Sequence, residues 1–358
     1  EVGMGTADQD FPIAPAITRA LRDRIAHENY GYLTIPSSYK ESIVNWNQRR
    51  YGLHIDPDTI LHSPGVHPAI ISTLRAFCPP GSKLLMQTPG YNGFYADIRV
   101  VGTLAEESPL KLEGGRYHMD FEDLERRIDH DTHALILCNP HNPTGSLLPH
   151  DKVLRFIDDI PDHIMVAVDE VYIQFVRDKV YTDFIEVAKE RENVTVLRTF
   201  SKAHGLGGMR VGYAVGHQKL MKRLAPFSMG LLGRNVLSVH AAQAALHDEA
   251  HIGRSQRVVW DGNDYLTSEL QKLGLSVLPS HTNFLWVDFG QKTSDVVREL
   301  SRRRVMVRGG AGGWGSPSSR LKSKGRPSPP GPPGCWRRWR DRLRSWGHRA
   351  SVPTGCPQ

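Results

Sequence analysis

Short apolar runs alternate with helical patterns along most of the chain. The apolar runs have the length of buried strands and end at turn residues; four of them lie around residues 134–138, 164–168, 194–198 and 211–215. Between them, hydrophobic residues recur every three to four positions, as on the buried face of a helix. Strands that alternate with helices predict βα units around a mainly parallel sheet, so the predicted fold class is α/β.

The first hundred residues follow the same alternation. Hydrophobic residues at helical spacing predict a helix within residues 8–29. Two strand–turn–helix units follow, at residues 59–78 and 83–95. In the first of them, Gly65 stands at a turn that leads into a helix, and such a turn exposes backbone N–H groups that bind phosphate.

Two segments in the middle of the chain are also predicted: residues 110–128 have the pattern of a strand followed by an acidic helix, and residues 229–246 that of a loop and a core helix. A smaller unit is predicted near the end of the pattern. From about residue 257, a long amphipathic helix leads to two further predicted strands, at residues 276–278 and 283–289.

The stretch from Thr199 to Gly212 carries the strongest candidate chemistry. Lysines usually stay charged at the surface, whereas Lys202 stands among small, apolar and hydroxylated residues, before a glycine cluster and Arg210. Hydroxyls and a guanidinium can hold a phosphate, and a lysine beside a phosphate site is suited to Schiff-base chemistry. A glycine-rich loop with a solvated lysine is the alternative.

Two predicted strands end in polar residues. One runs into a turn that contains Asn142, and the next is followed by Asp169 and Tyr172. In open α/β sheets, ligands bind beyond the carboxyl ends of the strands. We therefore expect these three side chains and Lys202 to face one crevice.

With these motifs in order, the chain resembles the fold-type-I pyridoxal-phosphate enzymes and, among them, the class I and II aminotransferases. The matching motifs are Asn-Pro-Thr-Gly at 142–145, Asp-Glu-Val-Tyr at 169–172, and Ser-Lys at 201–202 with Arg210 eight residues after the lysine. The resemblance covers roughly residues 8–310. It implies a large domain with a mainly parallel sheet flanked by helices, a smaller discontinuous α/β domain, and pyridoxal 5′-phosphate (PLP) as the cofactor.

The resemblance also implies a role for each motif residue. Lys202 is the catalytic residue and binds the cofactor as a Schiff base. Asp169 pairs with the pyridinium nitrogen, which keeps the ring an electron sink. Asn142 and Tyr172 would hydrogen-bond the phenolic oxygen of the ring. Thr199 and Arg210 would contact the phosphate.

Three further segments resemble parts of the family's cofactor site. Gly65, Val66 and His67 would form the phosphate cup, with His67 contributing its backbone N–H and no acid–base chemistry. Tyr91 would stack on the cofactor ring. Tyr32 would cross a dimer interface to the phosphate of the partner subunit, or else pack beneath a loop of its own chain.

Two subfamilies resemble different halves of the chain. The first half, with Ser-Pro-Gly-Val at 63–66 and Thr-Pro-Gly-Tyr at 88–91, is similar to C–S lyases of the cystathionine β-lyase type. The second half, from Thr199 through Tyr213, is similar to histidinol-phosphate-type aminotransferases. C–S lyases generally lack an arginine at the position of Arg210, so we expect an aminotransferase that moves an amino group from an L-amino acid to a 2-oxo acid. A C–S β-lyase is the alternative, and the cofactor-sensing domain of a transcriptional regulator is a second one.

By resemblance, the chain up to residue 310 divides into three parts, and residues 311–358 form an aberrant tail. Residues 1–35 are the N-terminal segment of the small domain. This segment begins at Glu1 and is expected to be truncated. Residues 36–256 form the large PLP-binding domain, and residues 257–310 form the rest of the small domain. The family resemblance also implies a homodimer with active sites at its interface.

Composition changes this picture in two respects. The net charge of +7 arises in residues 309–358, which hold ten Lys and Arg and one acidic residue, so the remainder has 35 basic and 37 acidic residues. A nearly neutral body argues against nucleic-acid binding. The sequence has no membrane-length apolar run, no signal-peptide pattern and no metal-ligand spacing. Cys78 and Cys138 in apolar surroundings indicate reduced core thiols, as in a cytoplasmic protein.

The chain changes character after Gly310. Residues 311–358 are rich in Gly, Pro, Arg, Ser and Trp and cannot bury enough apolar surface to fold alone. This tail is a disordered basic arm, an irregular C-terminus, or an out-of-frame translation of a GC-rich gene. We favour the last, because a small-domain strand is under way and the expected final helix never follows. Arg320 is the candidate for the family's arginine that binds the substrate α-carboxylate.

Overall fold

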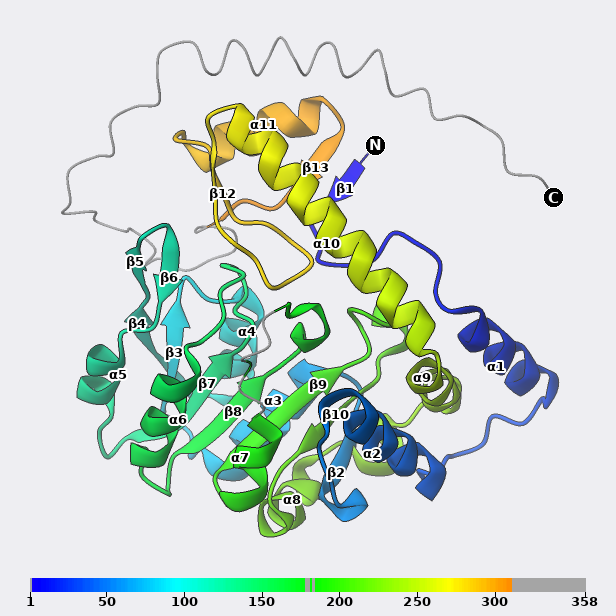
Figure 1. The fold of residues 1–358 in the computed structure, drawn as a ribbon. Helices are drawn as coiled ribbons and strands as arrows, with labels where there is room; N and C mark the ends of the chain where they lie inside the picture. Colours follow the sequence, from blue (N-terminus) through cyan, green and yellow to red (C-terminus); the bar gives the residue numbers. More distant parts are fainter. Residues whose placement is uncertain (1, 178–180, 182–183, 311–358) are drawn as a thin grey trace, which may run out of the picture.

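A seven-stranded sheet forms the centre of the computed structural model, which describes residues 2–177, 181 and 184–310 (Figure 1). Strands lie in the order β2-β10-β9-β8-β7-β3-β4. From β9 to β4 all neighbours are parallel, so the predicted α/β class with a mainly parallel sheet is confirmed. The strand bounds are β2 (Ile60–Ser63), β3 (Lys83–Thr88), β4 (Leu104–Pro109), β7 (Thr132–Cys138), β8 (Met165–Asp169), β9 (Val194–Thr199) and β10 (Gly212–Val215).

Helices cover both faces of the sheet, because successive strand residues point to opposite sides. Val166 and Val168 of β8 belong to a hydrophobic cluster with α2, α6, α7 and α9. Met165 and Ala167 belong to a second cluster with α3, α4 and α8. Burial on both faces explains why the strands are continuous apolar runs. The helix bounds are α2 (Ser37–Tyr51), α3 (Val66–Phe77), α4 (Asn92–Val101), α6 (His150–Asp159), α7 (Phe184–Glu190), α8 (Gln218–Leu224) and α9 (Val236–His247).

Strand β10 runs antiparallel to both of its neighbours, β9 and β2. A parallel neighbour needs a long crossover connection, usually a helix. The connection from Thr199 to Gly212 contains only one short 3-10 turn, η3 (Gly207–Met209). The chain therefore turns back beside β9, and the loop that carries Lys202 stays at the carboxyl edge of the parallel strands.

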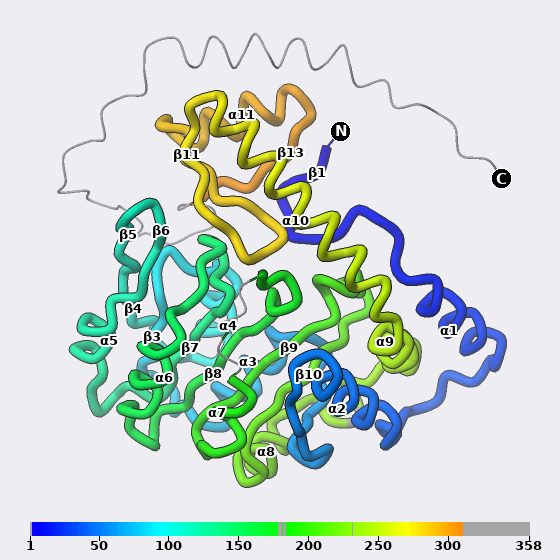
Figure 2. The backbone as a smooth tube through the Cα atoms, in the orientation of Figure 1, coloured from blue at the N-terminus to red at the C-terminus, as the bar shows by residue number. Residues whose placement is uncertain are grey.

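A smaller unit lies at the end of the long helix α10 (Glu249–Lys272) (Figure 1). Within it, β11 (Ser276–Val277) pairs antiparallel with β12 (Val287–Asp288), and α11 (Thr293–Arg302) leads to β13 (Val305–Val307). The first strand, β1 (Val2–Met4), pairs parallel with β13, so the start of the chain lies beside the last described strand (Figure 2). Helix α1 (Pro15–Ala26) packs instead on α9 of the large unit.

Two sequence predictions of strands need correction. Of the strand predicted at residues 283–289, only β12 (Val287–Asp288) forms; Phe284 precedes it, and its ring lies edge-on to that of Tyr172 with 5.3 Å between ring centroids. The pattern at 110–128 is a two-stranded hairpin, β5 (Lys111–Glu113) and β6 (Arg116–His118), before the predicted acidic helix α5 (Phe121–Arg127). The tail from residue 311, with Arg320, lies outside the described residues.

A buried ion pair lies beneath the carboxyl edge of the sheet. Arg198 of β9 donates to Glu170 Oε2 from Nε at 2.8 Å, and its Nη2 lies 2.7 Å from the same oxygen. Both side chains are at most 1% exposed. Charges this deep are costly unless they are paired, so removing one partner leaves an uncompensated charge.

We expect Arg198→Met to lower the free energy of unfolding by about 3–5 kcal/mol. The double variant Arg198→Met/Glu170→Leu should regain most of that loss, because it removes the remaining charge. Urea unfolding followed by tryptophan fluorescence measures both. Equal destabilisation of the single and double variants would contradict this account.

Candidate active site

Polar side chains gather beyond the carboxyl ends of β7, β8 and β9. Asn142, in the turn after β7, donates from Nδ2 to the hydroxyl of Tyr172 at 3.3 Å. Tyr172 follows β8 and is almost fully buried. Lys202 follows β9, and its Nζ lies 5.5 Å from the centroid of the Tyr172 ring. The structure therefore brings together Asn142, Tyr172 and Lys202, as the sequence predicts.

Lys202 is an unusual lysine because its amine points inward. Its Nζ donates to the carbonyl oxygen of Ala7 at 2.8 Å. Burial lowers the pKa of this amine, and the positive charges of Arg308 and Arg210 lower it further, while Asp8 and Asp169 oppose the shift. A lowered pKa increases the share of neutral amine at a given pH, and the neutral amine is the form that acts as a nucleophile and a base.

Asp169 ends β8 as a buried carboxylate. It is 4% exposed, and its Oδ1 accepts a hydrogen bond from the backbone N–H of Val171 at 3.1 Å. Burial raises its pKa to about 6, although the charges of His67 and Lys202 oppose the shift. A buried carboxylate with a raised pKa lacks full compensation of its charge, so a cation bound next to it would be stabilised. A protonated pyridine nitrogen is such a cation.

A phosphate cradle is formed where α3 begins. Gly65 precedes the helix with a φ of +128°, and a Cβ there would lie 2.6 Å from Nη2 of Arg210. Glycine is therefore required both by the backbone conformation and by the approach of the guanidinium. The free N–H groups of the first turn and the guanidinium together favour an anion. Nearby, Thr199 Oγ1 donates to Ser201 Oγ at 2.9 Å.

Together these residues fit PLP. The cradle suits its phosphate, the buried carboxylate suits its pyridinium nitrogen, and Lys202 offers an amine of lowered pKa. The fit rests on a position that a Cβ would fill and on a buried carboxyl with a raised pKa. The individual residue roles predicted from the sequence remain predictions.

Tyr91 and His67 form a pair of rings beside the cradle. Tyr91 immediately precedes α4, and its ring meets that of Phe94 edge-on at 5.5 Å between centroids. For His67, the sequence predicted a role for the backbone N–H alone. In the structure its imidazole is bonded, with Nδ1 2.6 Å from Asp97 Oδ2. Asp97 lies on the second turn of α4, and nothing in the sequence indicated that it would reach this histidine.

Arg308 is a candidate site residue that the sequence analysis missed. It follows β13, and its positive charge lowers the pKa of Lys202, Tyr91 and Tyr172 against the stronger effect of burial on the two tyrosines. The charge of Arg308 therefore acts on three groups of the site. The only sequence signal was a lone arginine directly after a predicted strand, before the pattern fails at Gly310.

Tyr32 is exposed rather than packed beneath a loop. Its side chain is 85% exposed, so the alternative of a packed tyrosine is wrong. The neighbouring carbonyl of Leu33 accepts a weak hydrogen bond from Arg234 Nη1 at 3.4 Å, which links this segment to the loop before α9. Met229 and Leu232 of that loop are also exposed.

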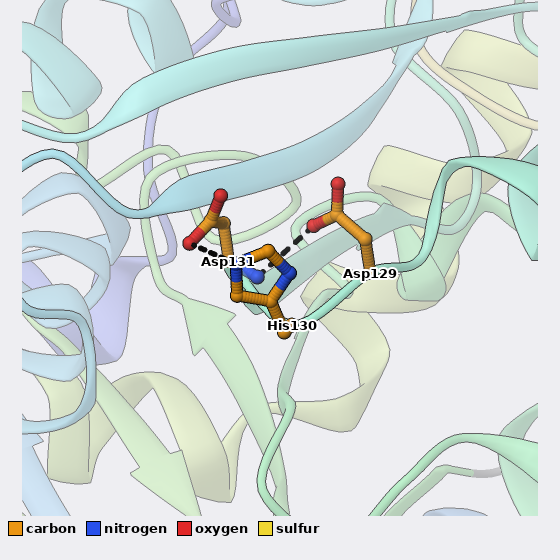
Figure 3. Close-up of side chains that lie close together, drawn as sticks. All are labelled: Asp129, His130 and Asp131. Atoms are coloured by element: carbon orange, nitrogen blue, oxygen red, sulfur yellow. Dashed lines mark hydrogen bonds and ion pairs between the residues drawn. The ribbon is translucent and has the colours of Figure 1, made fainter.

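One group of potential metal ligands occurs among the described residues, remote from these side chains in the sequence. Asp129, His130 and Asp131 lie together in an exposed turn (Figure 3). Asp129 already pairs with Lys83 at 2.5 Å and accepts from the backbone N–H of Asp131. The cluster follows from adjacency in the sequence and from local pairing, so we assign it no metal.

Comparisons with known proteins identify the family of the chain. The family model "Aminotransferase class I and II" matches residues 2–319. Histidinol-phosphate aminotransferase 2 of Carboxydothermus hydrogenoformans is 31% identical over 303 residues, which cover 83% of this chain and 80% of that protein. An aromatic amino acid aminotransferase of Mycobacterium avium is 31% identical over 257 residues, which cover 72% and 71%.

Solved structures show the same relationship. A histidinol-phosphate aminotransferase from Sinorhizobium meliloti in complex with PLP has a TM-score of 0.75 at 25% identity, covering 86% of this chain and 82% of that one. Cystalysin of Treponema denticola has a TM-score of 0.80 at 20% identity, covering 86% and 82%, which shows a shared fold alone. The chain belongs to the class I and II aminotransferase family, and its cofactor is PLP.

Helix α10 is the longest described helix, and it is amphipathic rather than uniformly apolar. Among the described residues, no helix combines the length and the apolarity needed to cross a membrane.

Proposed function

We propose that this aminotransferase moves the amino group of an L-amino acid to a 2-oxo acid, with Lys202 as the proton carrier. PLP, when bound, withdraws electrons from the Cα of the amino acid and makes its proton acidic. Lys202 would take that proton from Cα and deliver it to the cofactor carbon attached to the ring. The observation that carries the proposal is the position of the Lys202 amine, which is partly buried, donates to the carbonyl oxygen of Ala7 and lies 5.5 Å from the centroid of the Tyr172 ring; burial lowers its pKa.

The other residues hold the reaction in place. Asp169 keeps the pyridine nitrogen protonated through its buried negative charge. Asn142 and Tyr172 are hydrogen-bonded to each other. Both would hydrogen-bond the phenolic oxygen of PLP and so orient its ring. Gly65 and Arg210 hold the phosphate, supported by Val66, His67, Thr199 and, from a partner subunit, Tyr32.

A half-reaction experiment tests the function. The purified protein with PLP should have a visible absorption band that bleaches with an L-amino acid alone and returns after a 2-oxo acid is added. Release of pyruvate and ammonia from a cysteine thioether, with a persistent band, would instead indicate a C–S β-lyase. A band that persists with every amino acid, without product, would indicate a cofactor-sensing domain.

Arg308 is proposed to contact the anionic group of the substrate, a role that the sequence analysis gave to Arg320. Arg308→Gln is expected to raise the KM for the amino acid about ten-fold, or about 1.4 kcal/mol, with little change in kcat. The effect is modest because Arg308 is exposed. Steady-state kinetics measures it, with Arg302→Gln of α11 as the matched control. An unchanged KM in the Arg308 variant would contradict the assignment.

We also propose a homodimer in which Tyr32 reaches the partner's phosphate site. The exposed side chains of Tyr32, Met229 and Leu232 support an interface at the joined loops. For the domain division at residues 1–35, 36–256 and 257–310, the pairing of β1 with β13 supports the start of the chain in the small domain, whereas α1, within residues 1–35, packs on α9 of the large unit. Cys78 and Cys138, both buried and free, support a reducing compartment such as the cytoplasm.

A further inference from the structure

His67, Asp97 and Tyr91 form a hydrogen-bonded row beside the phosphate cradle. His67 Nδ1 lies 2.6 Å from Asp97 Oδ2, and His67 Nε2 lies 3.4 Å from the hydroxyl of Tyr91. The Asp97 side chain is only 6% exposed, whereas that of His67 is 38% exposed. A buried carboxylate that meets one imidazole nitrogen at this distance holds the ring in a single orientation.

Gly93 provides the space for this row. A Cβ at Gly93 would lie 2.3 Å from His67 Cε1 and 2.5 Å from Tyr91 Cε1. The backbone of Gly93 is not in the left-handed region, so conformational freedom is not what requires glycine there. The imidazole and the phenol pack over its backbone, with 5.5 Å between the ring centroids.

The imidazole also faces the charged groups of the cofactor site. The hydrogen bond to Asp97 raises the pKa of His67, and the charge of Asp169 raises it further, while burial and Arg210 oppose the shift. His67 thus interacts with the carboxylate expected at the pyridine nitrogen and with the guanidinium expected at the phosphate. When protonated, the ring donates from Nδ1 to Asp97 and from Nε2 to Tyr91.

We propose that His67 is a positioning residue for Tyr91. Held by Asp97 and seated over Gly93, its imidazolium fixes the phenol ring at the cofactor and adds a positive charge to the phosphate cradle. This inference rests on the proposed function, because it takes PLP as the ligand of the site. Loss of the proton removes the charge beside Arg210 and reverses the hydrogen bond, so that Tyr91 donates to Nε2.

The pH dependence follows from the direction of the shift. The pKa of His67 is raised, so its contribution to PLP affinity is present while the ring is protonated and is lost as pH rises through that raised pKa. PLP affinity of the full-length apoprotein is measured by titration from about pH 6 to about pH 9. Comparing variants with the wild type at each pH cancels the ionisation of the phosphate itself.

Three substitutions and one control make the test specific. His67→Gln should weaken PLP binding about ten-fold at about pH 6, which is the smaller of the effects typical for residues that support a ligand-binding residue. It should also abolish the pH-dependent step in PLP affinity. Asp97→Asn should move the step to lower pH, because the imidazole loses its charged partner. Gly93→Ala should also weaken binding, by displacing the imidazole. Arg99→Gln, an exposed charge change on the same helix, should behave as the wild type.

Thermal unfolding of each apoprotein separates positioning from folding. Wild-type affinity and profile in the His67 and Asp97 variants would overturn the inference while leaving the proposed function intact. Weaker binding in proportion to lost thermal stability, with the wild-type pH step retained, would also overturn it. Absence of PLP binding by the wild type would refute the proposed function and this inference together.

Discussion

Lys202→Ala is expected to lower kcat by about 10⁴-fold or more. The variant loses both the amine that binds the cofactor covalently and the base that carries the Cα proton. No other described lysine is placed by the structure with its amine over the Tyr172 ring. Single-turnover absorbance with an L-amino acid measures the loss. Borohydride treatment of the wild type should attach the cofactor to the peptide that contains Lys202.

The control for this prediction is Lys222→Ala, an exposed lysine on α8. It should retain wild-type rates and spectra. The pH dependence adds a second check: because burial lowers the pKa of Lys202, the free amine should lose its proton at lower pH than a surface lysine. Normal turnover by Lys202→Ala, or cofactor attached at another lysine, would refute the assignment.

Asp169→Asn is expected to affect activity and stability in opposite directions. The rate should fall about 10³-fold, since the buried charge that keeps the pyridine nitrogen protonated is lost. The apoprotein should instead become more stable at neutral pH. The carboxyl has a folded pKa of about 6 against an ordinary value of 3.8, so ionising it in the folded protein costs up to about 3 kcal/mol.

The direction of this effect can be checked against pH. Because the folded pKa is raised, the wild-type apoprotein loses stability as pH rises from about 4 to about 6, and the asparagine variant does not. Urea unfolding of both apoproteins at the two pH values measures the difference. Asp162→Asn, at a 99% exposed carboxylate, is the control. Equal pH profiles for the wild type and Asp169→Asn would mean that Asp169 is not the buried, charged group.

The predictability of the site from the sequence has a simple physical reason. Asn142, Asp169 and Lys202 each follow a buried strand, and the carboxyl ends of parallel strands meet at one edge. Once the alternation of strands and helices established a mainly parallel sheet, the convergence of these residues followed. The glycine at position 65 could be predicted for the same kind of local reason, because a turn into a helix end exposes N–H groups.

Other features depend on contacts between distant segments. The edge strand β4 was missed, because half of its residues face solvent and its centre carries Glu106 and Glu107, so it lacks an apolar run. The strand predicted at 283–289 is short because Phe284 packs on Tyr172. Tertiary packing overrides local propensity in both places.

The fold class and the residues at the strand ends were predictable from periodicity and the order of the elements, and the family from the resemblance of three motifs. The antiparallel direction of β10, the effect of the Arg308 charge on the pKa of Lys202 and the partner of the His67 imidazole became apparent in the folded structure alone. Electrostatic influence and hydrogen bonding depend on distance in space, and Asp97 and His67 are 30 positions apart in the chain. Periodicity carries no information about such distances, so these contacts follow from the folded packing alone.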